Sequence, residues 1–100
     1  MVEYTPNTDR IFESLADKTR RDILITVSED ELTISEIALS YDMSFAAIAK
    51  HIEILEVAGL VAKRKDGKKR YVSMIPGSIE IVKTFINNID YGLLNKPYMV

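Results

Sequence analysis

Residues 33–60 read TISEIALSYDMSFAAIAKHIEILEVAGL and contain two helix signals joined by a short connection. Thr33 and Glu36 form a capping box, in which each side chain accepts a hydrogen bond from the backbone N–H of the other residue. Ser44 caps a second helix, which we expect to run to about Ala58. Two helices joined by so short a turn predict a helix-turn-helix unit.

The second of these helices has a narrow apolar stripe. On a helical wheel, Ile48, Ile52 and Leu55 share one face, which is the face expected to be buried. The opposite face carries a mixed set of side chains: Ala46, Lys50, Glu53 and Val57. We therefore expect one face of this helix to be free to contact another molecule.

A basic hairpin follows directly. The runs 60–65 and 68–75 flank Asp66-Gly67, and an Asp-Gly pair between such runs favours a type I′ turn with positive φ at both positions. Residues 63–70 hold six basic residues and one acid, which gives this segment a charge of +5. The whole chain has a net charge of −2, so the other 92 residues together carry −7. A helix-turn-helix followed by a basic hairpin predicts a winged helix with a nucleic-acid partner.

Helices are also expected on both sides of this unit. One covers about residues 8–16, a second begins after the N-cap Asp17, and the last covers about 78–94 with Ser78 as its cap. The last helix has apolar residues on more than one face, so it needs a second surface to pack against in addition to its own core. Another subunit is the candidate for that surface. The predicted dimer interface comprises Ile11, Phe12, Leu15, Ile79, Val82, Phe85, Ile86, Ile89 and Leu93.

These elements predict one fold class, a mainly α (α+β) winged helix. Its order is four helices, a two-stranded hairpin wing and a C-terminal helix (ααααββα). The chain of 100 residues is 47% hydrophobic and 28% charged, which fits one globular domain over residues 1–100.

The composition also excludes several classes of function. There is no cysteine, which excludes disulfides, thiolate metal sites and a catalytic thiol, and one histidine does not make a metal site. No glycine-rich phosphate loop, HExxH motif or Ser/His/Asp set is present, so we expect no enzyme, no cofactor and no metal. No apolar run could span a bilayer, and the first ten residues lack the apolar segment of a secretory signal. We therefore expect a cytoplasmic protein without a membrane partner.

Three segments resemble the ArsR-type winged helix-turn-helix transcriptional regulators. Residues 15–24 (LADKTRRDIL) resemble the opening signature of that family, 43–61 resemble its recognition helix and exit, and 67–72 (GKKRYV) resemble its wing. The resemblance covers roughly residues 9–76. It implies a homodimeric repressor whose dimer interface is formed by the first and last helices. Such a dimer would bind a palindromic operator in double-stranded DNA. The helix over 44–58 would lie in the major groove, and the wing over 60–75 on the backbone or minor groove.

The sequence departs from the family pattern in two places. The third helix has no cysteine and the last helix offers only Glu80 and Asp90, so a transition-metal sensor is not expected and any small-molecule effector stays unidentified. Where family members often carry polar residues, this helix has Phe45 and three alanines, which cannot hydrogen-bond base edges. Phosphate contacts and DNA shape should then carry more of the specificity.

Two of the expected DNA contacts have alternative interpretations. Phe45 reads either as a DNA contact or as core packing. His51 lies beside the apolar stripe and reads either as a hydrogen-bonded structural residue or as a phosphate contact. The predicted DNA-binding set is Ser35, Ser44, Phe45, Ala46, Ala47, Lys50, His51, Lys63, Arg64, Lys68, Lys69 and Arg70.

A second class of function stays open at this point. The alanine-rich face at Ala46, Ala47 and Ala49, together with the acidic remainder of the chain, would also fit a protein-interaction module. Such a module would keep the winged-helix scaffold with little or no DNA readout.

Overall fold

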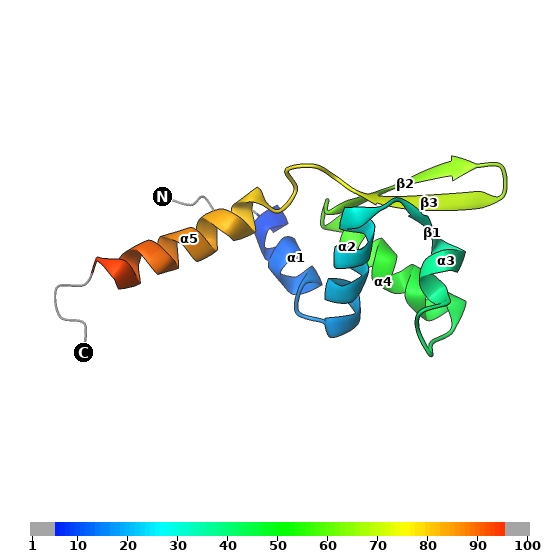
Figure 1. The fold of residues 1–100 in the computed structure, drawn as a ribbon, viewed down its shortest axis with the longest axis horizontal. Helices are drawn as coiled ribbons and strands as arrows, with labels where there is room; N and C mark the ends of the chain where they lie inside the picture. Colours follow the sequence, from blue (N-terminus) through cyan, green and yellow to red (C-terminus); the bar gives the residue numbers. More distant parts are fainter. Residues whose placement is uncertain (1–5, 96–100) are drawn as a thin grey trace.

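The computed structural model describes residues 6–95, so the expectations for residues 1–5 and 96–100 lie outside the described part of the chain. Its elements, in chain order, are α1 (Pro6–Ser14), α2 (Lys18–Glu29), β1 (Leu32–Thr33), α3 (Ile34–Ala38), α4 (Phe45–Val57), β2 (Val61–Asp66), β3 (Lys69–Met74) and α5 (Glu80–Leu94) (Figure 1). The predicted winged-helix class is confirmed. The short strand β1 is an addition that the sequence does not predict.

The core lies between the helices α1 to α4 and the sheet. Ile48, Ile52 and Leu55 on α4 are completely buried, which confirms the predicted stripe. Ile23 from α2 and Leu60 from the exit of α4 are equally buried against them. Because α4 is held along this one stripe, its opposite face remains at the surface.

The sheet has three strands in the order β1-β3-β2, and both pairs are antiparallel. Val72 in the central strand pairs with Leu32 of β1 and with Lys63 of β2, and it is fully buried. β1 pairs only with Tyr71 and Val72 in the middle of β3, so the tip of the hairpin extends past β1 (Figure 1). β1 thus joins the wing to the segment that starts α3.

The predicted hairpin turn is wrong by one residue. Asp66 pairs with Lys69, so Asp66 ends β2 and the two central residues are Gly67 and Lys68. Gly67 has φ 62°, and none of the described non-glycine residues has positive φ, which excludes type I′. Positive φ at the first central position alone is the pattern of a type II′ turn, which requires glycine at that place.

Side-chain caps start three of the helices. Asp17 accepts from the backbone N–H of Arg20 at the start of α2, and Ser44 accepts from the N–H of Ala47 at the start of α4. The predicted capping box of α3 is present in both directions. The predicted cap of α5 is wrong, because α5 begins after Ile79 without a side-chain cap. The hydroxyl of Ser78 donates instead to the carbonyl of Leu60, 3.4 Å away.

Helix α5 projects from the body beside α1 and makes the molecule 58 Å long (Figure 1). Its first turns pack on the core through Ile79, Ile81 and Val82, and the Phe85 ring meets that of Phe12 edge-on with centroids 5.3 Å apart. Beyond that point its apolar residues are exposed. None of the helices within residues 6–95 has the length and hydropathy needed to cross a membrane.

Candidate nucleic-acid interface

The first turn of α4 lies open at the surface. The Ser44 hydroxyl accepts the N–H of Ala47 at 3.1 Å, which fixes the start of the helix. Phe45 is 55% exposed, so it is not core packing. Lys50, one turn further along, is exposed and forms an ion pair with Glu53 at 3.3 Å. This end of α4 therefore presents side chains that a large partner can reach.

A groove of about 370 Å³ runs between this end of α4 and the hairpin, and we name it the wing groove. The residues that line it come from the start of α3, from α4 and from both strands of the wing. They are Thr33, Ile34, Ser35, Phe45, Ala49, Lys63, Lys68, Lys69 and Arg70. Six of the twelve predicted DNA-binding residues (Ser35, Phe45, Lys63, Lys68, Lys69 and Arg70) are thereby brought together, from segments up to 35 positions apart in the sequence.

Three cations on the wing groove are unpaired. Lys68, Lys69 and Arg70 are exposed, and none of them forms a hydrogen bond or ion pair with another side chain in residues 6–95. The nearby carboxylate of Glu36 accepts the N–H of Thr33 at 2.9 Å. The N–H and hydroxyl of Thr33 lower the pKa of Glu36 most, and the charge of Lys69 lowers it further without forming an ion pair. The charge at the hairpin tip is therefore available to an anionic partner.

The other two predicted wing contacts are paired within the protein. Lys63 forms an ion pair with Glu56 of α4 at 3.1 Å. Arg64 donates to both carboxylate oxygens of Glu31, and its guanidinium lies 4.3 Å from the centre of the Tyr71 ring. Part of the positive charge that the sequence assigns to the wing is thus neutralised before any partner arrives.

His51 lies at the junction of α4 with the start of α2. Its Nδ1 is 3.8 Å from the Asp17 carboxylate and 3.3 Å from an Arg20 guanidinium nitrogen, and its side chain is 21% exposed. Arg20 also donates to the backbone carbonyls of Ser14 and Glu13, so this guanidinium joins α1, α2 and α4. The contacts of His51 are those of a hydrogen-bonded structural residue.

Comparison with known proteins explains this arrangement. The family model described as "Bacterial regulatory protein, arsR family" matches residues 17–63. The HTH-type transcriptional regulator YuzN of Bacillus subtilis is 48% identical over 71 residues, which are 64% of this chain and 77% of YuzN. The chain belongs to the ArsR family. It is accordingly a DNA-binding transcriptional regulator with a winged-helix fold.

Two further comparisons extend the match to almost the whole chain. The transcriptional repressor SdpR of Bacillus subtilis is 29% identical over 89 residues, which are 85% of this chain and 99% of SdpR. The crystal structure of the ArsR family transcriptional regulator RHA00566 superposes with a TM-score of 0.87 at 29% identity. That superposition covers 96% of this ArsR-family chain and 99% of the other.

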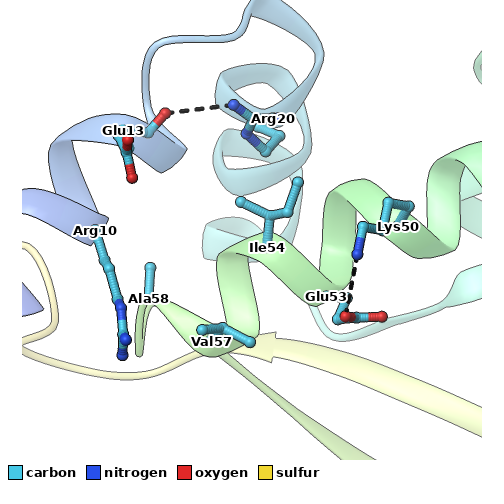
Figure 2. A pocket seen from close by; sticks show the side chains of 8 residues that line it. All are labelled: Arg10, Glu13, Arg20, Lys50, Glu53, Ile54, Val57 and Ala58. Carbon is cyan, nitrogen blue, oxygen red and sulfur yellow. Dashed lines mark hydrogen bonds and ion pairs between the residues drawn. The ribbon is translucent and has the colours of Figure 1, made fainter.

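A second groove, of about 510 Å³, lies at the other end of α4 in this ArsR-family protein. Figure 2 shows three cations and two carboxylates around an apolar floor formed by α4, with Lys50 paired to Glu53. The lining residues are Arg10, Glu13, Arg20, Lys50, Glu53, Ile54, Val57 and Ala58. Because both signs of charge surround it, this groove is a poorer match to a polyanion than the wing groove. No group of three His, Asp or Glu side chains within residues 6–95 is placed to hold a metal ion.

Sequence reasoning missed the carboxylates that pair with the wing. Glu31 lies in a polar run that reads as a turn, and it is 33 positions away from Arg64. Glu56 is one of two acids on α4, and nothing in its spacing distinguishes it from Glu53. Glu31 would be identified by the registers of β1 and β2 against β3, and Glu56 by the packing of α4 against β2. Sequence alone gives neither.

Proposed function

We propose that this ArsR-family regulator is a homodimeric, cytoplasmic repressor without enzymatic activity, and that residues 1–100 are one DNA-binding domain. In this proposal α4 enters the major groove, and the hairpin tip contacts the backbone or minor groove. The observation that carries it is the wing groove, which gathers Phe45 and Ala49 of α4 with the unpaired Lys68, Lys69 and Arg70. Repression is proposed because relatives carry that name, among them SdpR and the arsenical resistance operon repressor of Escherichia coli.

The proposed contacts differ in kind. The tip cations would bind phosphates. Each such contact contributes about −0.9 to the salt slope, which is the slope of the logarithm of the binding constant against the logarithm of the salt concentration. Ser35, Ser44, Phe45, Ala46, Ala47 and Lys50 would face the DNA from the helix-turn-helix unit, with Phe45 and the alanines limited to apolar contacts such as thymine methyl groups. The side chains of His51 and Lys63 are only 21% and 27% exposed and pair with residues of other elements, so we leave them out of the proposed contacts. Lys50 is 67% exposed and pairs within its own helix, with Glu53, so it is retained.

The dimer is proposed from α5. Ile86, Ile89 and Leu93 form an exposed apolar stripe, and each is about half exposed, at 56%, 50% and 50%. An apolar face of this kind on a protruding helix is typical of a subunit interface. Ile11, in contrast, is 5% exposed and belongs to the core of its own chain, so it offers almost no surface to a partner. We leave Ile11 out of the proposed interface.

The proposal is tested by selecting bound duplexes from a random-sequence pool at low salt. A dimer with two α4 helices predicts enrichment of an inverted repeat whose half-site centres are about 10 base pairs apart. Enrichment of a single half-site would contradict the dimeric arrangement. Absence of binding to any duplex, even at low salt, would contradict the DNA-binding geometry itself.

A further inference from the structure

Arg64 belongs to a compact cluster that spans the whole sheet, which we name the Arg64 cluster (Arg64, Glu31 and Tyr71). Its Nη2 donates to Glu31 Oε1 at 2.7 Å, and its Nε donates to Oε2 at 3.1 Å. The same guanidinium stacks over the Tyr71 ring, with 4.3 Å between its central carbon and the ring centre. The Nε–Nη2 edge and one face of the guanidinium are thus occupied.

The cluster joins the wing to the rest of the protein. Tyr71 in the central strand β3 lies directly opposite Arg64 of β2 and Thr33 of β1. The side chains of these three residues therefore share one face of the sheet. Glu31 precedes β1 and lies outside the hairpin. A bidentate pair between Arg64 and Glu31 therefore fixes the hairpin relative to the segment that leads into α3 and α4.

These contacts conflict with a phosphate contact by Arg64. To offer its Nε–Nη2 edge to a phosphate, the guanidinium would have to leave Glu31. A phosphate bound by the remaining Nη1 donors would instead lie close to the negative Glu31 carboxylate. The neighbouring Lys65 faces no such competition, because it forms no hydrogen bond or ion pair with another described side chain. The wing therefore contains two kinds of cation, paired and free.

We propose that Arg64 is a positioning residue, which holds the hairpin at a fixed angle to α4 through Glu31 and Tyr71 and makes no phosphate contact itself. This inference rests on the proposed DNA-binding geometry, in which the tip cations Lys68, Lys69 and Arg70 bind the phosphates. It assigns the wing two separate functions, with orientation at its base and charge at its tip.

The pKa of Glu31 supports this assignment. The hydrogen bond from Arg64 lowers the pKa of this carboxyl below its ordinary value of 4.5. A lowered pKa in the folded state means that the pair is complete above pH 4.5 and is lost as the pH falls through the lowered pKa. The cluster is therefore intact at neutral pH, where the protein would bind DNA.

Salt-dependent DNA titration separates the two roles. Glu31→Gln and the charge-balanced double variant Arg64→Gln/Glu31→Gln should each weaken binding about three- to fivefold, with an unchanged salt slope. Glu29→Gln is the matched control, because it makes the same charge change two residues away and the Glu29 side chain forms no hydrogen bond or ion pair within the described part. It should not weaken binding. The proposal is overturned if Glu31→Gln tightens binding more than Glu29→Gln does, or if the double variant reduces the salt slope by about 0.9.

A second measurement on the DNA-free protein does not depend on the proposed function. Amide hydrogen exchange in β2 and β3 should be faster in Glu31→Gln and in Arg64→Lys, which keeps the charge but loses the bidentate fork. Glu29→Gln should leave exchange unchanged. If the wild type binds no duplex, the proposed function fails while this measurement still decides the role of the cluster. Unchanged exchange in both cluster variants would refute it.

Discussion

Replacing Ile89 with alanine should weaken the proposed dimer without unfolding α5, because alanine is the better helix former. Half of the Ile89 side chain is exposed in the single chain, at 50%. Burying a whole isoleucine side chain stabilises by about 1.5–3 kcal/mol, so covering the exposed half is worth about 1 kcal/mol. The substitution occurs in both subunits of a symmetric dimer and therefore costs about 2 kcal/mol, or roughly a thirtyfold increase in the dimer dissociation constant.

Sedimentation equilibrium over a wide concentration range measures this dissociation constant directly. Asn88→Ala is the matched control, because Asn88 is exposed on the same helix but lies off the apolar stripe, and it should leave the constant unchanged. Circular dichroism should show equal helix content in all three proteins. A wild type that is monomeric at tens of micromolar, or an Ile89→Ala dimer as tight as the wild type, would refute the reasoning.

Two further predictions concern the helix-turn-helix scaffold. Thr33→Ala removes one side of the capping box and should lower the free energy of unfolding by about 1 kcal/mol in a urea titration, whereas the exposed neighbour Ser35→Ala should change it little. The pKa of Asp17 is lowered chiefly by the N–H of Arg20, so this cap stabilises the fold above pH 3.8 and its contribution is lost as the pH falls through the lowered pKa. Unfolding of Asp17→Asn should therefore depend less on pH in that acidic range, and an equal dependence would contradict the assignment.

The parts of the fold that local chemistry specifies could be predicted from the sequence. The capping box at Thr33, the cap at Ser44 and the stripe at Ile48, Ile52 and Leu55 each act within one or two helical turns. These signals suffice to place α3 and α4, and the position of α4 in turn defines its exposed face. The resemblance to ArsR-type regulators rests on residues 15–24, 43–61 and 67–72, of which the second contains α4, and the comparisons confirm it.

The parts that depend on tertiary contacts could not be predicted. β1 is two residues long and exists because Leu32 and Thr33 pair with β3, which is 38 or more positions away. The turn shifts from Asp66-Gly67 to Gly67-Lys68 because the pairing register places Asp66 opposite Lys69. In both cases the deciding interaction lies across the sheet.

In the candidate site, too, the features set by local sequence could be predicted and those set by tertiary contacts could not. The helix-turn-helix and wing signals correctly bring Phe45 and the tip cations to one groove. The sequence predicts phosphate contacts first at Lys68, Lys69 and Arg70 and next at Lys63 and Arg64, whereas the structure pairs Lys63 with Glu56 and Arg64 with Glu31. Charge counts along a chain do not include such pairs, because the partners come from other elements.

The salt dependence of DNA binding tests the central claim most directly. The triple variant Lys68→Gln/Lys69→Gln/Arg70→Gln removes the three proposed phosphate contacts of each subunit. The magnitude of its salt slope should be smaller than that of the wild type by about 2.7 for each wing that contacts the DNA, since each phosphate contact contributes about 0.9. A control variant with glutamine at Lys18, Arg21 and Lys83 has the same net charge and should keep the wild-type slope. Equal slopes for the wild type and the wing variant would contradict the claim that the wing groove is the DNA-binding surface.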